Sequence, residues 1–573
     1  MKIWTVDFGR TAPWALILLL AAGCGADMGM DGASPPDDMD AAPGDEQNAV
    51  DWNQDWGWDE NGNSGAGAAP PDEDFIPEEE DFVVQQVAAT DSYVFVPNQS
   101  EGSDTVALID GWDFSVNPIR VGLEPVQVVA AQVEQQGAVG YVLSVGNPTV
   151  SIIRADQGVG DQRADVRILS IPWEVNQLVM APDGRHVLAY IDPELPINDS
   201  ASAASLQTMA LIRLGETPGT DEIFELSVTR RIQEIAFTTD GTQAFVVGEE
   251  GINRLSLWDI KSDAFIPALD LQMQTSIFTP QDQEVQFSSE GTTMVMRTSQ
   301  YSGLGLFALD PEDLKAQDQR MVELPGVPTD LDLVEREDGS LLAVATLREQ
   351  GKIALFEVAD AFEADEEDEF IRYLDTAGAE AGIGRLAPDE SVMAVFSTLP
   401  SIPTVGLVDL ETETIETYGL RNQIRSLEIS PDSRTAVVVH RAQPDLPSTG
   451  DPEDEFRRGE GLTLWDLETG YRRPIVLQGE PEEILMTTDA DGHPFLYVMI
   501  TSDAPNRQGV MRIDLGTHRT DFVRLHRRPM QLGIVAEQVF CSQDAETGRI
   551  TFLDVNTTDQ RTVSGYELNA GIE

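Results

Sequence analysis

The chain has 573 residues, of which 41% are hydrophobic and 24% charged, so it carries enough apolar material for a sizeable core and is not disordered throughout. Its 100 acidic and 36 Lys+Arg residues give a formal net charge of -64, which excludes nucleic acid as a partner because such a field repels phosphate. Two cysteines exclude a disulfide-stapled scaffold and an all-cysteine zinc site.

The basic residues are four lysines and 32 arginines. Two explanations remain open. One is adaptation to salty surroundings, in which case stability should increase with molar salt, because salt screens the repulsion between carboxylates. The other is a GC-rich genome, which favours arginine codons, combined with an ordinary acidic secreted protein.

The N-terminus reads as a secretion signal. An apolar run covers residues 14–22 after Lys2 and Arg10. This run is too short to span a bilayer and fits the hydrophobic region of a signal peptide. It ends in Ala21-Ala22-Gly23-Cys24. The segment resembles a bacterial lipoprotein signal, although Ala21 stands where that family usually has Leu.

The resemblance implies that residues 1–23 are removed and that Cys24 is lipidated, which would be the only membrane attachment. Gly25, rather than Asp, follows the cysteine, so the resemblance also implies the outer membrane. An ordinary signal peptide with an incidental cysteine is the alternative.

The next segment, residues 24–82, is strongly acidic. Residues 26–82 contain 18 acidic residues and no Lys, Arg or His. A one-signed charge run with few apolar residues predicts a disordered, extended tether. Trp52, Trp56 and Trp58 interrupt it; they form a docking motif or pack on the folded domain.

From residue 83 to residue 573, short apolar runs are separated every 8–12 residues by turn residues, which predicts an all-β domain with little helix apart from residues 311–319. Similar turns, mostly of Asp-Gly type, recur at 181–184, 239–241, 289–291, 337–339, 387–390, 430–433 and 490–492. Strands ending in an acidic residue recur as well, at Asp259, Asp310, Glu357, Asp409, Asp466, Asp514 and Asp554. This period predicts a β-propeller of four-stranded blades, with about ten units in one ring or two. An elongated β-sandwich array is the alternative.

Two sets of residues resemble known propeller families. Trp258-Asp259 and Trp465-Asp466 resemble WD-repeat blades, although the Gly-His signature of that family is missing. Residues 93–98 and 141–147, each followed by a Thr-Val strand at Thr105 or Thr149, resemble bacterial YVTN-type and lactonase-like propellers. The resemblance implies the fold, and it implies a lactonase-like hydrolase only as an alternative function.

Sequence motifs for catalysis or metal binding are absent. The chain has no HExxH or GxSxG motif, and its five histidines lack local metal-binding spacing. We therefore predict no metal, no cofactor and no catalytic residue. Glycine-rich letters at 303–308 and 382–387 read as blade residues, His186 and His440 as strand histidines, and Cys541 as a buried thiol.

The densest basic cluster consists of His518, Arg519, His526, Arg527 and Arg528. We predict that it contacts carboxylates or a partner; the alternative is a solvated loop that balances local charge. The sequence thus predicts an extracytoplasmic, membrane-anchored lipoprotein whose propeller acts as a binding or assembly scaffold rather than an enzyme. Its partner would be an envelope protein or an extracellular ligand.

Overall fold

The structure is a computed structural model in which a single compact unit is described. The residues described are 88–98, 102–158, 164–172, 175–192, 208–249, 251–261, 264–271, 283–310, 316–336, 338–364, 366–376, 378–379, 381–399, 403–504, 506–545, 547–557 and 559–566. The expected signal peptide, Cys24 and the acidic tether lie outside them. No helix among the described residues has the length and apolar character needed to cross a bilayer.

Ten antiparallel sheets follow one another along the chain, and we call them blades 1 to 10. Blade 1 is β1 (Tyr93–Pro97), β2 (Thr105–Asp110) and β3 (Val116–Arg120). Blade 2 is β4 (Pro125–Val133), β5 (Gly137–Ser144), β6 (Thr149–Arg154) and β7 (Asp165–Ser170). Blade 3 is β8 (Gln177–Met180), β9 (His186–Tyr190), β10 (Thr208–Arg213) and β11 (Glu222–Ser227). Blade 4 is β12 (Ile232–Phe237), β13 (Gln243–Gly248) and β14 (Gly251–Ser256).

The next three blades have four strands each. Blade 5 is β16 (Gln283–Phe287), β17 (Thr293–Thr298), β18 (Gly303–Leu309) and β19 (Ala316–Glu323). Blade 6 is β20 (Asp330–Glu335), β21 (Leu341–Leu347), β22 (Lys352–Glu357) and β23 (Arg372–Asp375). Blade 7 is β24 (Ile383–Leu386), β25 (Val392–Phe396), β26 (Thr404–Asp409) and β27 (Thr414–Gly419).

The last three blades are also four-stranded. Blade 8 is β28 (Ile424–Ile429), β29 (Thr435–His440), β30 (Gly461–Asp466) and β31 (Arg472–Val476). Blade 9 is β32 (Glu480–Thr488), β33 (Pro494–Thr501), β34 (Gly509–Asp514) and β35 (Thr520–Arg524). Blade 10 is β36 (Pro529–Val535), β37 (Gln538–Gln543), β38 (Arg549–Asp554) and β39 (Gln560–Ser564).

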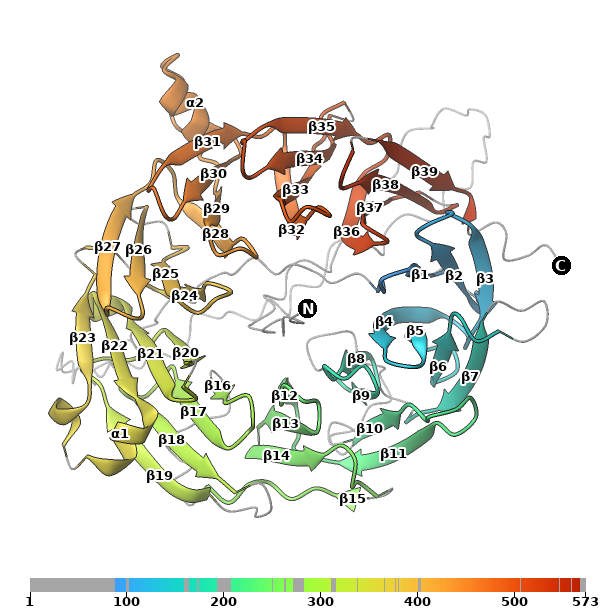
Figure 1. Ribbon diagram of the computed structural model, residues 1–573, viewed down its shortest axis with the longest axis horizontal. Helices are drawn as coiled ribbons and strands as arrows, with labels where there is room; N and C mark the ends of the chain where they lie inside the picture. Colours follow the sequence, from blue (N-terminus) through green and yellow to red (C-terminus); the bar gives the residue numbers. More distant parts are fainter. Residues whose placement is uncertain are drawn as a thin grey trace, which may run out of the picture. The chain divides into compact units, whose positions relative to one another are not determined.

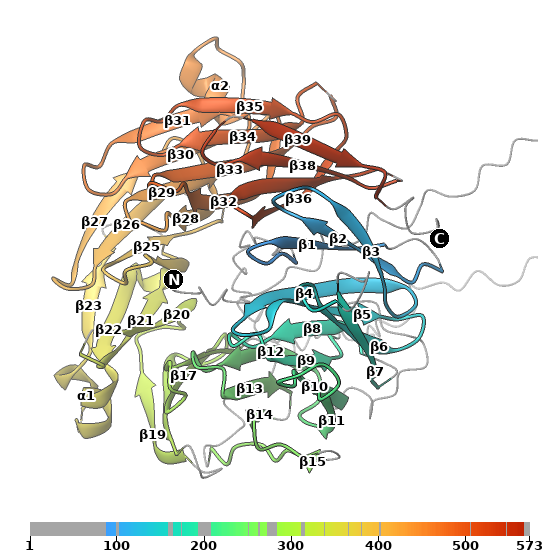
Figure 2. The ribbon, with the colours of Figure 1, turned by 45° about the vertical axis from the view of Figure 1, so that its right-hand side comes forward.

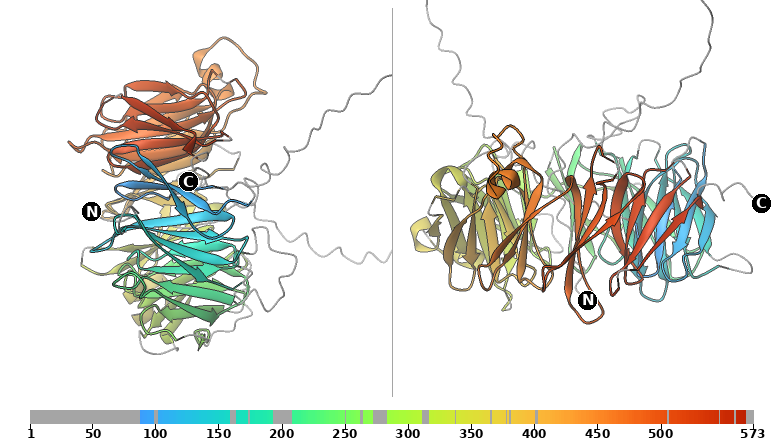
Figure 3. Two further views of the ribbon diagram at one scale, coloured as in Figure 1. Left: turned by 90° about the vertical axis from the view of Figure 1, so that its right-hand side faces the viewer. Right: turned by 90° about the horizontal axis from the view of Figure 1, so that it is seen from above.

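The blades are arranged around one axis, with the first strand of each four-stranded blade innermost and the last at the rim (Figure 1). Neighbouring blades pack face to face around the ring (Figure 2), and the strands run between its two faces (Figure 3). Because each blade is an antiparallel meander, its first and third turns lie on one face. Its second turn and the link to the next blade lie on the opposite face.

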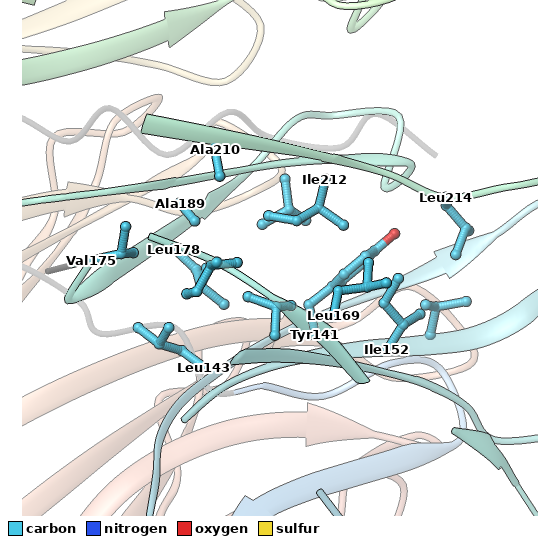
Figure 4. Packing of buried hydrophobic residues seen from close by; sticks show 14 of the residues in the cluster. Tyr141, Leu143, Ile152, Leu169, Val175, Leu178, Ala189, Ala210, Ile212 and Leu214 are labelled. Atoms are coloured by element: carbon cyan, nitrogen blue, oxygen red, sulfur yellow. The ribbon is translucent and has the colours of Figure 1, made fainter. Parts of the chain in front are cut away.

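Buried apolar residues form ten clusters, and each cluster joins two adjacent blades. At the seam between blades 2 and 3, Tyr141 and Ile152 pack against Ile212 (Figure 4). The last cluster joins Val94 of blade 1 to Phe552 of blade 10. The prediction of a β-propeller with about ten units is therefore confirmed, and the ring is single.

Aspartate side chains hold the recurring turns. In the first turn of blade 3, Asp183 Oδ1 accepts the N–H groups of Arg185 (2.8 Å) and His186 (3.2 Å). In the third turn of blade 9, Asp514 Oδ1 accepts those of Gly516 (2.9 Å) and Thr517 (2.8 Å). Asp409, Asp466 and Asp554 hold their turns in the same way, because a short carboxylate can replace a backbone acceptor.

Blades 1 and 4 depart from the predicted four strands, since each has three among the described residues. Blade 4 is followed by an additional strand. The residues after β14 form the two-residue strand β15 (Ala264–Phe265), which pairs in parallel with β11 of blade 3. A few residues later, Ala268 forms an isolated bridge with Asn253 of blade 4. This segment therefore ties blades 3 and 4 together at the rim.

The expected helix at 311–319 is wrong for the part that is described, since Ala316 to Gln319 belong to strand β19. Two short α-helices were not predicted. They are α1 (Val358–Glu363), between β22 and β23, and α2 (Pro452–Arg458), between β29 and β30. Both lie in connections between strands, where the strand periodicity does not constrain the chain.

Candidate functional site

The structure separates the two halves of the predicted basic cluster. His518 and Arg519 lie in the third turn of blade 9, before β35, whereas His526, Arg527 and Arg528 lie in the link after it. The five residues of β35 extend about 17 Å at 3.3 Å each, and its two ends are on opposite faces of the ring. Arg528 forms an ion pair with Glu482 (3.3 Å), while His526 and Arg527 are exposed.

Other residues accompany His518 and Arg519 at the rim of blades 7 to 9. We call this group the Arg–Tyr surface; it consists of Arg421, Tyr471, Arg472, Arg473, His518 and Arg519. Arg421 follows β27, Tyr471 immediately precedes β31, and Arg472 and Arg473 are the first two residues of β31. The surface thus combines one half of the predicted cluster with residues that the sequence analysis did not single out.

Tyr471 immediately precedes β31 and Arg472 is its first residue, and alternation along the chain directs their side chains to different neighbours. On one side, Arg472 Nη1 donates to Gly419 O of blade 7 (2.7 Å), and its guanidinium lies 5.5 Å from the Tyr418 ring centre. On the other side, the ring of Tyr471 stacks on His518 of blade 9, with centres 5.8 Å apart and planes 7° from parallel. Tyr471 is 57% exposed, so the stacking holds an aromatic ring in place at the protein surface.

A cavity of about 320 Å³ lies between the end of β27 and the outer strands of blade 8. It is lined by Gly419, Leu420, Arg421, Thr463, Gly470, Tyr471, Arg472 and Pro474. Arg421 keeps 57% of its side chain exposed and is 3.9 Å from Glu453 of α2. Two arginines and one tyrosine therefore border a single cavity.

A smaller cavity of about 140 Å³ lies on blade 9 and is lined by Phe495, Arg512, Asp514, Arg519 and Asp521. Arg512 is committed to the next blade, because it donates to Val555 O (2.5 Å) and Thr557 O (2.9 Å). Arg519 lies 3.5 Å from Asp521 and is mostly exposed. This cavity therefore offers one accessible cation.

The charge of this region differs from that of the preceding blades. Residues 421–530 contain 14 arginines and 18 acidic residues, whereas residues 311–420 contain seven basic and 26 acidic residues. Burial, together with the nearby Arg473 cation, lowers the pKa of His518 below its usual value. His518 is therefore a neutral stacking partner at pH 7, and the positive charge comes from the arginines.

One buried pair adjoins the larger cavity. His440 Nδ1 donates to Gln423 O (3.2 Å), so Nε2 carries no proton and accepts from the Thr463 hydroxyl (2.7 Å). A hydroxyl held by an oriented imidazole is the arrangement of an activated nucleophile. However, burial lowers the pKa of His440 to about 4, and Thr463 is only 5% exposed. His440 is accordingly a weak base.

The remaining predicted residues have structural surroundings. His186 is buried, with Nδ1 2.6 Å from Asp183 and its ring against Trp258. Cys541 is buried, and this burial raises the pKa of its thiol. The glycine-rich segments belong to β18 and to the start of β24. No group of three or more potential metal ligands occurs among the described residues.

The sequence signal for the Arg–Tyr surface is the run Tyr471-Arg472-Arg473 after the turn that begins at Asp466 and ends at Gly470. Two adjacent arginines and a tyrosine at the start of an outer strand would have indicated an exposed basic and aromatic edge. The partner residues Arg421 and His518 lie about 50 positions away in either direction, so only the fold brings them close.

Comparisons with known proteins bear on the fold alone. No family model and no curated protein sequence matches the chain. Among solved structures, a eukaryotic initiation factor is similar at a TM-score of 0.44 and 10% identity, covering 76% of this chain and 96% of its own. A putative 6-phosphogluconolactonase from Bacteroides uniformis has a TM-score of 0.31 and 14% identity, covering 60% and 93%.

The WD40 domain of Neurospora crassa Pan2 has a TM-score of 0.29 and 12% identity, covering 56% of this chain and 87% of its own. The chain thus has structural neighbours among lactonase-like and WD40 propellers. At these identities, no activity or partner of those proteins is transferred to it.

Proposed function

We propose that this chain is an extracytoplasmic lipoprotein whose propeller recognises an envelope protein or an extracellular ligand through the Arg–Tyr surface. The lipid anchor would be attached at Cys24, whose sequence context resembles a lipoprotein signal, and the acidic tether would hold the propeller away from the membrane. The Gly25 position supports an outer-membrane location.

The observation that carries the recognition role is the cavity bordered by Arg421, Tyr471 and Arg472. Arginine and tyrosine are enriched at binding hot spots, because a guanidinium binds carboxylates in a fixed fork and a tyrosine provides a rigid contact area. Here Arg472 is held by the Gly419 carbonyl and Tyr471 by the His518 ring. A site that is already ordered loses little conformational entropy on binding.

A lactonase-like hydrolase is the second candidate, and the Thr463–His440 pair is the observation that favours it. Threonine would act as the nucleophile and histidine as the base. Substituting Thr463→Val keeps the side-chain shape and removes the hydroxyl. If the protein hydrolyses lactones or esters and this variant does not, the enzymatic function replaces the recognition role.

The recognition role is tested by crosslinked affinity purification of the full-length protein from detergent-solubilised membranes, read by mass spectrometry. We expect one or two stoichiometric partners for the unaltered protein and their loss in the double variant Arg421→Glu/Tyr471→Ala. The matched control is Arg527→Gln, which removes an exposed arginine outside the Arg–Tyr surface.

Equal capture of the partners by all three proteins would refute a role for this surface. Capture lost in the control as well would return the role to His526, Arg527 and Arg528. The anchor is tested by Cys24→Ser, which should release the protein from membranes into the soluble fraction.

A further inference from the structure

We propose that the larger cavity of the Arg–Tyr surface binds one carboxylate-bearing sugar ring, such as a uronic acid residue of a glycan. This inference rests on the proposed recognition function and names the chemical class of its ligand. The site is the space bordered by Arg421, Tyr471 and Arg472, and its charge, its shape, its glycine walls and the neighbouring strand edge favour such a ligand.

The charge of the cavity favours a ligand with a single carboxylate. Arg421 and Arg472 enter the cavity from different blades, and a carboxylate between two guanidinium groups gains charge-assisted hydrogen bonds. The protein as a whole is strongly acidic, so a long polyanion would be repelled by its remaining surface. A ligand with one carboxylate keeps the local attraction and avoids that repulsion, because charges beyond about 8 Å are screened at physiological salt.

The size of the cavity favours a single ring. A volume of about 320 Å³ is at the lower end of small-molecule sites, which span about 300–1,000 Å³. It accommodates a single ring rather than a folded chain. Tyr471 borders the cavity and is 57% exposed, and the C–H face of a pyranose packs well on an aromatic ring.

Two walls of the cavity carry no side chain. Gly419 and Gly470 present backbone to the cavity, and a Cβ at either position would meet no atom within 4 Å. Without side chains on these two walls, a ring can approach the backbone closely, while Arg472, which donates to Gly419 O (2.7 Å), stays beside it.

The strand edge beside the cavity favours a sugar over a peptide. An extended peptide would bind by adding a strand to the exposed edge of β31. Pro474 lies within that strand, and proline lacks the N–H group that strand addition needs. The rim of blade 8 therefore disfavours a peptide in β conformation.

The experiment measures binding of four probes to the full chain by ligand-observed NMR and calorimetry. The probes are galacturonate, galactose, a short peptide with a free C-terminal carboxylate, and inorganic phosphate. We expect galacturonate to bind with a Kd of about 1 mM, typical of one small ring, and the other probes to bind at least tenfold more weakly. Molar salt should weaken galacturonate binding, because the contact is electrostatic.

Two variants locate the site. Arg421→Gln removes one guanidinium that is mainly solvent-exposed, so the fold should tolerate it. Gly419→Val adds bulk at a position with open space and without positive φ. Each should weaken galacturonate binding at least fivefold, whereas Arg507→Gln, at an exposed position in the second turn of blade 9, should leave it unchanged. Gly470 is unsuitable for this purpose, because its φ of 70° strains any other residue.

The inference is overturned if no probe binds, if galactose binds as well as galacturonate, or if the peptide or phosphate binds more tightly. It is also overturned if Arg421→Gln binds galacturonate normally. In each case, the affinity purification decides what remains. If the unaltered protein captures a membrane partner and Arg421→Glu/Tyr471→Ala does not, the recognition role stands and only the sugar is rejected. Loss of both results would reject the two proposals together.

Discussion

Two seams of the ring use the same position with different chemistry. Between blades 2 and 3, Gln127 of β4 accepts Leu178 N–H (2.7 Å) and donates to Leu178 O (3.2 Å). Between blades 9 and 10, Glu483 of β32 accepts Leu532 N–H (2.7 Å), while its second oxygen has no partner among the described residues. Both residues follow a proline by two positions, at a bulge in an innermost strand.

The difference shows what an amide gains over a carboxylic acid at a buried seam. The amide is neutral and satisfies both backbone groups of the neighbouring strand. Glu483 is only 4% exposed, and burial raises its pKa to about 8. It therefore carries a proton at pH 7, because an unpaired buried charge is unfavourable.

Asp330 of β20 repeats the arrangement between blades 6 and 7, where it accepts Gly384 N–H (2.6 Å). Burial, together with the carboxylates of Glu284 and Asp332, raises the pKa of Asp330 above its usual value. The inner ring of seams is thus held partly by side chains that reach the backbone of the next blade, and two of these seams depend on pH.

The largest expected effect comes from exchanging the two chemistries. Because the folded-state pKa of Glu483 lies above its ordinary value of 4.5, the folded protein binds the extra proton, and stability falls as pH rises from 4.5 to 8. At about 1.4 kcal/mol per pKa unit, the full effect is at most about 5 kcal/mol. Glu483→Gln should remove this loss, and Gln127→Glu should introduce a similar one.

The measurement is the free energy of chemical unfolding at several pH values for the unaltered protein and both variants. The window from pH 6.5 to 8 isolates the carboxylic acid from histidine. Parallel profiles of Glu483→Gln and the unaltered protein across that window would contradict this account of the seam.

The second-largest effect is the loss of stability at acid pH that His440 causes. The folded-state pKa of His440 is about 4, below the ordinary 6.5, because burial disfavours its charged form. The unfolded chain then binds the extra proton, so stability falls as pH drops from 6.5 to 4, by at most about 3 kcal/mol. In a Glu483→Gln background, His440→Gln should flatten this acid limb; an unchanged slope would assign it to other groups.

The smallest effect concerns a seam held by a cation. Arg512 donates to two carbonyl groups of blade 10, those of Val555 and Thr557. Lysine keeps the charge but lacks the planar fork, so Arg512→Lys should destabilise the protein by about 1–2 kcal/mol. Unfolding in denaturant at pH 7 measures this loss, and Arg527→Lys, at an exposed position, is the matched control.

The same geometry bears on the choice of arginine over lysine. Arg213 donates to Leu257 O (2.6 Å) and Trp258 O (2.9 Å) of the next blade, as Arg512 does in blade 9. Such contacts need several donors in one plane, which arginine provides. Some of the arginines are therefore required by the seams, whatever the salt concentration of the surroundings.

The amino-acid sequence predicted most of the strands and turns and a repeat of about ten units. Strand alternation and turns of Asp-Gly type are local, so they repeat visibly along the chain. Asp409, Asp466, Asp514 and Asp554 end strands as predicted, whereas Asp259 lies beyond the end of β14. It could not place the outer segment of blade 4 or the helices α1 and α2, because connections carry no periodicity.

Only the tertiary structure decided that the ten blades close into one ring, since closure joins residues as distant as Gln538 and Gly111, 427 positions apart. The same holds for the site. The pairs His518-Arg519 and Arg527-Arg528 are close in sequence but lie at opposite ends of the five-residue strand β35. In contrast, blade packing brings His518 onto Tyr471. Proximity across seams depends on which faces pack together, and the one-dimensional pattern does not encode that choice residue by residue.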